Sequence, residues 1–233
     1  MSFNPEKFVV PTAKPLPVCL LLDVSSSMSG AKIDSLNQAV SEMLESFAAE
    51  EKMETELLVS VITFGNQVEL SVPFTKASEI QWKNLPAGGM TPMGTALEMA
   101  KAMIEDKDTT PSRAYRPTIV LITDGQPTDK WEQPLENFTS KGRSSKCDRM
   151  AMVIGHNTDD SVLRRFVEGT KHDIFRVENA KELHAFFQHV TMSITSRSRS
   201  NNPNEIPMTT ETNILDKSIT IQDIRETDNE DYW

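Results

Sequence analysis

The stretch LPVCLLLDVSSSM, residues 16–28, is a short apolar run that breaks into a polar loop. A wholly apolar run of this length is typical of a strand buried on both faces, as the central strands of parallel sheets are. Apolar side chains then recur at helical spacing through residues 32–49, which predicts an amphipathic helix packed on the sheet. A strand followed by a helix is the first unit of an α/β fold.

The same alternation continues along the chain. Residues 56–64 predict a second strand, and Gly65-Asn66 predicts a tight turn into an antiparallel edge strand. The remaining predicted elements are a helix at 95–105, an apolar strand ending at the TDG of residues 123–125, a helix at 131–141, a strand at 148–154, a helix at 160–168, a strand at 174–177 and a last helix around 183–194. This order predicts a Rossmann-like, doubly wound α/β fold with a mostly parallel sheet and helices on both faces.

The size and composition of the chain limit its organisation. Its 233 residues can bury one substantial core, so we expect an extended segment at 1–14, one domain at 15–196 and an acidic, flexible tail at 197–233. The net charge of −10 and the pI near 5.0 argue against nucleic acid as the main partner. No apolar run approaches the roughly 20 residues of a membrane helix, and the N-terminus does not resemble a secretory signal, so we expect a cytoplasmic protein.

Two aspartates follow predicted strands, and this position makes them candidate ligands. In open α/β sheets, ligands gather at the carboxyl ends of the strands, where Asp23 and Asp124 both lie. Ser25 and Ser27 alternate with Asp23 in one short loop, and Thr91 lies in a glycine-rich loop before a predicted helix. An all-oxygen ligand set fits Mg²⁺, or Mn²⁺ as the alternative, better than zinc.

The low charge of this ligand set favours a metal ion that binds an external ligand over one that only stabilises the fold. If hydroxyls and water fill most of the coordination shell, the ion keeps much of its positive charge and accepts an anion from outside. We therefore expect a protein partner to offer an Asp or Glu side chain to the ion.

The combination of motifs resembles a known family. The D-x-S-x-S of residues 23–27, the threonine of GGMT at Thr91 and the aspartate of TDG at Asp124 are similar, in order and spacing, to the metal-ion-dependent adhesion site of von Willebrand factor type A (VWA) domains. The segments ITFGNQV, AGGMTPMGTAL and VLITDGQPTDKW resemble sequences of the bacterial tellurium-resistance TerY-like family of VWA proteins. This resemblance covers roughly residues 16–199.

This resemblance implies further properties. It implies a six-stranded sheet with one antiparallel edge strand, with Ser25, Ser27 and Thr91 as direct metal ligands and Asp23 and Asp124 acting mostly through water. It also implies an adaptor that works with a protein kinase and a protein phosphatase in bacterial stress response or phage defence.

Other functions compete with this interpretation. A Mg²⁺-dependent phosphatase could use Asp23 as its nucleophile. However, Ser25 stands where haloacid-dehalogenase-type enzymes place a second carboxylate, and the sequence has no glycine-rich phosphate-binding loop motif. We therefore expect the protein not to be an enzyme. An extracellular adhesion domain would be expected to show an export signal or a disulfide framework. In a scaffold protein, the metal would serve structure alone and the tail would bind partners.

Several side chains in these segments can have a purely structural role. The serines of residues 25–29 could cap a helix, Asp129 is expected at the surface or as a cap, and Arg197 is expected at a solvated helix end. Residues 205–233 carry eight acidic and two basic side chains, which is typical of a solvated segment. A sharper hypothesis is that a tail carboxylate, of the same or a neighbouring molecule, binds the metal until a partner displaces it.

Overall fold

The computed structural model describes residues 13–50, 55–155 and 159–206. Its strands are β1 (Lys14–Asp23), β2 (Thr55–Phe64), β3 (Val68–Lys76), β4 (Thr118–Thr123), β5 (Asp148–Ile154) and β6 (Ile174–Val177). Its α-helices are α1 (Ala31–Glu50), α2 (Met93–Glu105), α3 (Glu132–Ser140), α4 (Ser161–Val167) and α5 (Ala180–Ser198). Short 3-10 turns are η2 (Ser26–Met28), η3 (Ala77–Glu79) and η4 (Ser144–Lys146).

The six strands form one sheet in the order β3-β2-β1-β4-β5-β6. All neighbouring strands are parallel except β2 and β3, which pair antiparallel across the predicted turn, with Phe64 opposite Val68. The expected doubly wound α/β fold with one antiparallel edge strand is therefore confirmed. Among the described helices, none combines the length and the apolar character needed to cross a membrane.

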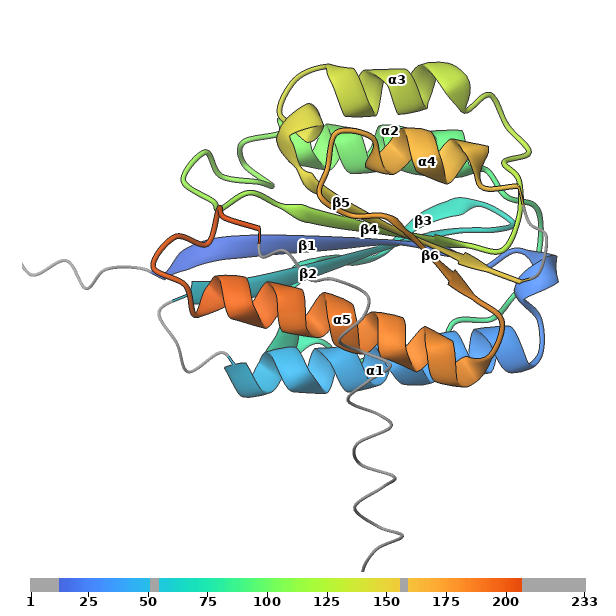
Figure 1. Ribbon diagram of the computed structural model, residues 1–233, viewed down its shortest axis with the longest axis horizontal. Helices are drawn as coiled ribbons and strands as arrows, with labels where there is room; N and C mark the ends of the chain where they lie inside the picture. The colour runs from blue at the N-terminus through green and yellow to red at the C-terminus, as the bar shows by residue number, and fades with distance from the viewer. Residues whose placement is uncertain (1–12, 51–54, 156–158, 207–233) are drawn as a thin grey trace, which may run out of the picture.

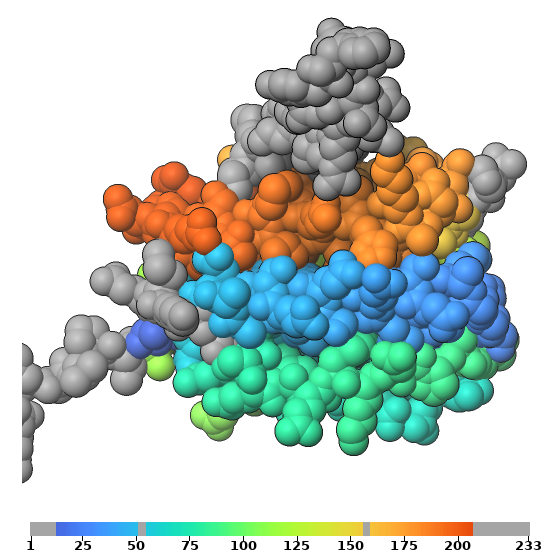
Figure 2. Space-filling model, turned by 90° about the horizontal axis from the view of Figure 1, so that it is seen from below, coloured from blue at the N-terminus to red at the C-terminus, as the bar shows by residue number. Residues whose placement is uncertain are grey.

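Helices cover both faces of this sheet. Helices α1 and α5 lie on one face, and α2, α3 and α4 lie on the other (Figure 1). Seen from the first of these faces, α5 in orange and α1 in blue lie side by side (Figure 2). The sheet is thus the middle layer of three, which explains why its central strands are apolar throughout.

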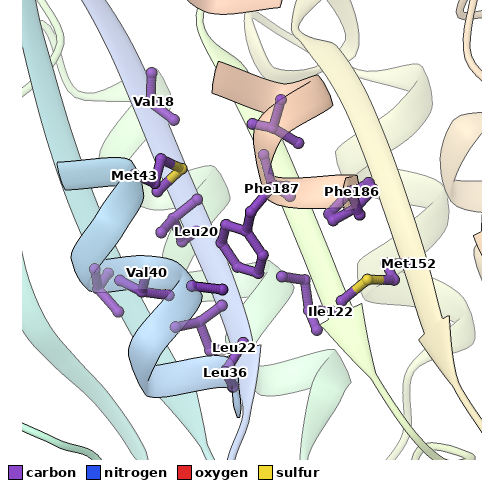
Figure 3. Packing of buried hydrophobic residues seen from close by; sticks show 14 of the residues in the cluster. Val18, Leu20, Leu22, Leu36, Val40, Met43, Ile122, Met152, Phe186 and Phe187 are labelled. Atoms are coloured by element: carbon purple, nitrogen blue, oxygen red, sulfur yellow. The ribbon is translucent and has the colours of Figure 1, made fainter. Parts of the chain in front are cut away.

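The central strand β1 contributes to both cores because successive side chains of a strand point to opposite faces. Leu20 and Leu22 pack under α1 and α5, whereas Cys19 and Leu21 pack under the opposite helices. Figure 3 shows the first core, in which Phe187 of α5 lies close to the β1 leucines. The two cysteines, Cys19 and Cys147, are both buried free thiols.

The order of the strands creates a switch point beside β1. The chain passes from β1 to β2 and β3 on one side, and then returns to the other side of β1 to form β4. The loops that leave β1 and β4 therefore diverge at the same edge of the sheet. Parallel α/β sheets bind ligands at such a point.

The C-terminal helix ends differently from the expectation. The predicted apolar stripe stops at residue 194, but α5 continues to Ser198, and Arg197 is 1% exposed instead of solvated. Its guanidinium finds enough polar partners inside the protein to replace water, including the carbonyl oxygen of Pro203 at 2.8 Å from Nε. The expected boundary of the domain at residue 196 stays a prediction, and residues 207–233 of the expected tail lie outside the described residues.

Candidate metal centre

The loops after β1 and β4 bring four of the five predicted ligands together. Asp23 is the last residue of β1, Ser25 and Ser27 belong to the turn that contains η2, and Asp124 directly follows β4. The Oγ atoms of Ser25 and Ser27 lie 3.0 Å apart, and Ser27 Oγ donates to Asp124 Oδ1 at 2.6 Å. Oxygen atoms separated by 97 residues of chain, those of Ser27 and Asp124, thus meet in one cluster.

Asp23 is the most enclosed member of this cluster. Its carboxylate accepts from the Ser25 backbone N–H at 2.8 Å and from Thr123 Oγ1 at 2.6 Å, and the residue is fully buried. Burial raises the pKa of Asp23 and the charge of Asp124 adds to the rise, although the hydrogen bonds from Ser25 and Thr123 oppose it. The protein groups around Asp23 therefore stabilise its charged form poorly.

A third loop closes the centre and carries Thr91. The backbone of Gly89 pairs with Ser26, since Ser26 N donates to Gly89 O at 3.0 Å and Gly89 N donates to Ser26 Oγ at 3.0 Å. Thr91 N donates to Thr128 Oγ1 at 3.0 Å, and Thr128 N donates to Thr91 O at 2.9 Å. Thr91 is buried, and these contacts fix it between the other two loops.

Asp129 has the capping role that its position allowed. Its carboxylate accepts from the backbone N–H groups of Gly94 at 2.9 Å and Thr95 at 2.8 Å, at the start of α2. The N-cap residue of this helix, Pro92, has no side-chain oxygen, so the cap comes from another loop. Asp129 thereby ties the loop after β4 to the loop that carries Thr91.

The capping alternative for the serine loop finds little support. Ser25 occupies the N-cap position of η2, but its side chain makes no capping hydrogen bond. Its hydroxyl faces Ser27 instead. The arrangement of Ser25 and Ser27 therefore fits ligands better than caps.

Lys32 belongs to this centre, and the sequence interpretation missed it. Lys32 Nζ donates to Asp124 Oδ2 at 2.5 Å and to the main-chain oxygen of Ser27 at 3.2 Å. A weak signal was present in the sequence, because a lysine in the first turn of a helix opposes the helix dipole and so needs another partner. The identity of that partner depends on the fold.

The donor chemistry of the centre fits a hard divalent cation. The candidate set offers two carboxylates and three hydroxyls, with no nitrogen or sulfur. In the part of the chain that the structure describes, no three His, Cys, Asp or Glu side chains are grouped so that they could hold a metal ion. A cation at this centre would therefore be neutralised by two carboxylates at most, and the ammonium on Asp124 shows that the cluster accepts positive charge.

The protein is a doubly wound α/β domain. Its oxygen-lined centre lies at the switch point of the sheet, where domains of this class bind ligands. The chain belongs to the von Willebrand factor type A domain family, whose profile matches residues 18–189. Domains of this family are commonly metal-dependent protein-interaction modules.

Two characterised relatives share this domain. Human inter-alpha-trypsin inhibitor heavy chain H6 is 23% identical over 197 residues, and chicken (Gallus gallus) matrilin-3 is 25% identical over 174 residues. The alignments cover 79% and 71% of this chain but 15% and 37% of those proteins. The relatives are thus much longer than the shared domain.

The fold also matches solved structures. Proximal thread matrix protein 1 from the mussel byssus, solved with a zinc-occupied metal-ion-dependent adhesion site, is 15% identical with a TM-score of 0.57. The match covers 78% of this chain and 48% of that one. At this identity the likeness establishes the fold alone.

Proposed function

We propose that Asp23, Ser25, Ser27, Thr91 and Asp124 hold a divalent cation and that this cation binds an acidic side chain of a protein partner. The observation that carries the proposal is the buried pair of aspartates at the switch point, which hydrogen bonds through Ser25 and Ser27 connect. The ammonium of Lys32 offsets one of their two negative charges. A divalent ion would neutralise this pair, and its binding would favour the charged form of Asp23.

The composition of the centre supports a role in docking. Hydroxyl groups carry no charge, so at most the two carboxylates of the candidate set can neutralise a divalent ion. Where the aspartates contact the ion through water, the ion remains electrophilic toward a further anion. A bound Mg²⁺ supplies a coordination position that a partner's carboxylate can take in exchange for water.

The all-oxygen ligand set supports Mg²⁺ as the resident ion, with Mn²⁺ as the alternative. Hard cations prefer oxygen ligands, whereas zinc is more often bound by nitrogen and sulfur. The zinc in the mussel protein indicates that a site of this type can take other divalent ions. A comparison of the three ions is therefore part of the test.

A phosphatase that uses Asp23 as nucleophile is disfavoured by the surroundings of its carboxylate. Both oxygens accept hydrogen bonds, and the side chain is shielded from solvent. A nucleophile must reach the reacting atom at about 3–3.5 Å, which this enclosure opposes. We therefore propose a binding module without catalytic activity; Mg²⁺-dependent turnover of phosphorylated substrates that Asp23→Asn abolishes would contradict it.

The finer proposal is a cytoplasmic adaptor of the TerY-like type, with a kinase or a phosphatase as partner. It rests on the motifs around Asp23, Thr91 and Asp124. A pull-down from native cells, with and without chelator, tests it. A kinase or phosphatase retained only without chelator would support this assignment, and metal-independent capture would favour the scaffold that binds through its tail.

The metal centre itself is tested by calorimetric titration of the full chain with Mg²⁺, Mn²⁺ and Zn²⁺. We expect saturable binding of one ion, and we expect Ser27→Ala and Asp124→Asn to weaken it by at least about tenfold, which corresponds to roughly 1.4 kcal/mol. Ser29→Ala is the matched control, because Ser29 is exposed in the same loop and is not one of the five proposed ligands.

The outcomes separate the candidate functions. If the wild-type protein takes up no divalent ion while its circular dichroism shows a folded domain, the metal centre is refuted. If Asp124→Asn loses the ion but keeps its partner, the ion serves structure and the docking proposal is wrong. A synthetic peptide of residues 207–233 that competes with the partner only in the presence of Mg²⁺ would support the tail as a resident ligand.

A further inference from the structure

Lys32 places a positive charge directly on the candidate metal centre. It is the second residue of α1, and its ammonium contacts Asp124 Oδ2 at 2.5 Å and the Ser27 main-chain oxygen at 3.2 Å. The side chain of Asp124 is fully buried in this pair, whereas that of Lys32 is 39% exposed. The ammonium therefore covers the carboxylate from the solvent side.

The position of this lysine is costly for the helix. The first turn of a helix carries the positive end of its dipole, so a cation there is destabilising unless it finds an anion. Helix α1 has 20 residues and its own acidic residue, Asp34, in this turn. The contact with Asp124 gives Lys32 a reason to be here that helix formation does not.

Two carboxylates in one buried cluster favour a nearby cation. Asp23 and Asp124 are both buried, and hydrogen bonds through Ser25 and Ser27 connect them. Two like charges in a poorly solvated cluster repel each other more than they would in water. The ammonium of Lys32 partly cancels this repulsion from within the same chain.

We propose that Lys32 is a tethered cation that competes with the divalent ion for Asp124. This inference rests on the proposed function and concerns its regulation. An incoming ion must either displace the ammonium from the carboxylate or remain beside it, and both alternatives oppose binding. Lys32 thus stabilises the ion-free domain and sets the ion concentration at which the centre fills.

The proposal predicts a gain of affinity from the loss of a contact. Lys32→Met removes the charge but keeps a long side chain, and we expect it to lower the Kd for Mg²⁺ and Mn²⁺ about tenfold, the order expected for one unit charge within a few ångströms of the ion. Lys32→Arg keeps the charge and should leave the Kd within about threefold of the wild type. Without any divalent ion, Lys32→Met should melt at a lower temperature than the wild type.

Lys76→Met is the matched control. Lys76 is similarly exposed and pairs with Glu56 at 2.9 Å, at the opposite end of the sheet from Asp23. It removes the same charge from the whole protein but leaves the centre untouched, so its Kd for Mg²⁺ should equal that of the wild type. A tightening equal to that of Lys32→Met would mean that net charge, and not competition at Asp124, controls affinity.

The experiment distinguishes failure of this inference from failure of the metal centre. Calorimetry of the full chain with Mg²⁺ alone and with Mn²⁺ alone gives the Kd values, and circular dichroism confirms that each variant is folded. If the wild type binds neither ion, the proposed function is wrong. If the wild type binds and a folded Lys32→Met binds no more tightly, the tethered-cation inference is wrong although the metal centre stands.

Discussion

At the scale of single residues, hydrogen bonds from backbone N–H groups shift the pKa of the Glu105 side chain. Glu105, the last residue of α2, accepts from Ser144 N and from Lys101 Nζ, each at 3.1 Å. Burial alone would raise the pKa of Glu105, but the hydrogen bonds from the Arg143 and Ser144 backbones and from Lys101 outweigh it and lower the pKa to about 2. The charged form of Glu105 is thus favoured by folding.

This shift predicts a defined loss of stability in acid. Because the pKa of Glu105 is lowered from its ordinary value of 4.5, the unfolded chain binds a proton more readily, and the stabilisation by Glu105 disappears as the pH falls from 4.5 to about 2. In Glu105→Gln this part of the pH dependence should be missing. The measurement is the free energy of unfolding of wild type and variant, by denaturant titration at each pH.

Glu136→Gln provides the comparison for this prediction, because Glu136 is an exposed residue of the neighbouring helix α3. The difference in the free energy of unfolding between wild type and Glu105→Gln should shrink in acid, and at neutral pH it should exceed the difference that Glu136→Gln makes. A Glu105→Gln profile parallel to that of the wild type would show that the hydrogen bonds of Glu105 do not favour its charged form.

At the scale of elements, the loop before α2 depends on one glycine. Gly89 has φ +88, and a Cβ placed on it would lie 2.3 Å from the backbone nitrogen of Asn66. The same residue makes both backbone contacts with Ser26. The loop can therefore approach the turn between β2 and β3, and hold Thr91 at the centre, only without a side chain at this position.

Gly89→Ala should consequently disturb both stability and the centre. We expect a loss of roughly 1–3 kcal/mol, as is typical for a strained backbone conformation, together with weaker Mg²⁺ binding. Gly125→Ala is the matched change in the loop after β4, where a Cβ meets nothing within 4 Å, and it should leave both properties nearly unchanged. Thermal melts and Mg²⁺ titrations give the two readouts; equal behaviour of the two variants would contradict the role of Gly89.

At the scale of the whole molecule, a buried polar cluster closes the end of the sheet opposite the candidate metal centre. Arg197 of α5 donates to Thr118 Oγ1 at 2.5 Å and to Arg116 O at 2.6 Å, and its Nη1 lies 3.8 Å from Asp148 Oδ2. Asp148 also contacts His172 Nε2 at 2.9 Å. This cluster joins the starts of β4 and β5 to the last helix.

Arg197→Met should therefore destabilise the domain strongly. The substitution takes the guanidinium away from buried Asp148, which keeps its contact with His172, and from the carbonyl oxygen of Arg116. Breaking a buried pair of this kind costs roughly 3–5 kcal/mol. Arg199→Met is the control, because Arg199 pairs with Glu50 at the surface and such pairs contribute little. Chemical denaturation followed by circular dichroism measures both, and a loss for Arg197→Met no larger than that for Arg199→Met would refute the structural role of the cluster.

Much of the fold could be predicted because its signals are local. The strands at 148–154 and 174–177 have the predicted bounds, since local apolar residues mark them: residues 150–154 in the first, and Ile174, Phe175 and Val177 in the second. The end of α5 could not be predicted in this way. Arg197 lies in the last turn of α5 and binds polar groups of distant segments. The spacing of apolar residues along the helix does not predict such contacts.

The candidate site could likewise be predicted only in part from the sequence. The alternation of Asp23, Ser25 and Ser27 and the position of Asp124 after a strand were readable from the sequence, because a strand end followed by polar residues defines a ligand-binding edge. Whether these five residues hold an ion stays a prediction.

The sequence by itself determined the α/β alternation, the antiparallel hairpin and the residue types of the centre, because these depend on periodicity and turns within a few residues. The tertiary structure alone decided that Thr123 would hold Asp23 across 100 residues and that Lys32 would reach Asp124 across 92. Such contacts depend on the order of the strands in the sheet. The same fold that gathers the two aspartates for a cation also supplies a cation of its own.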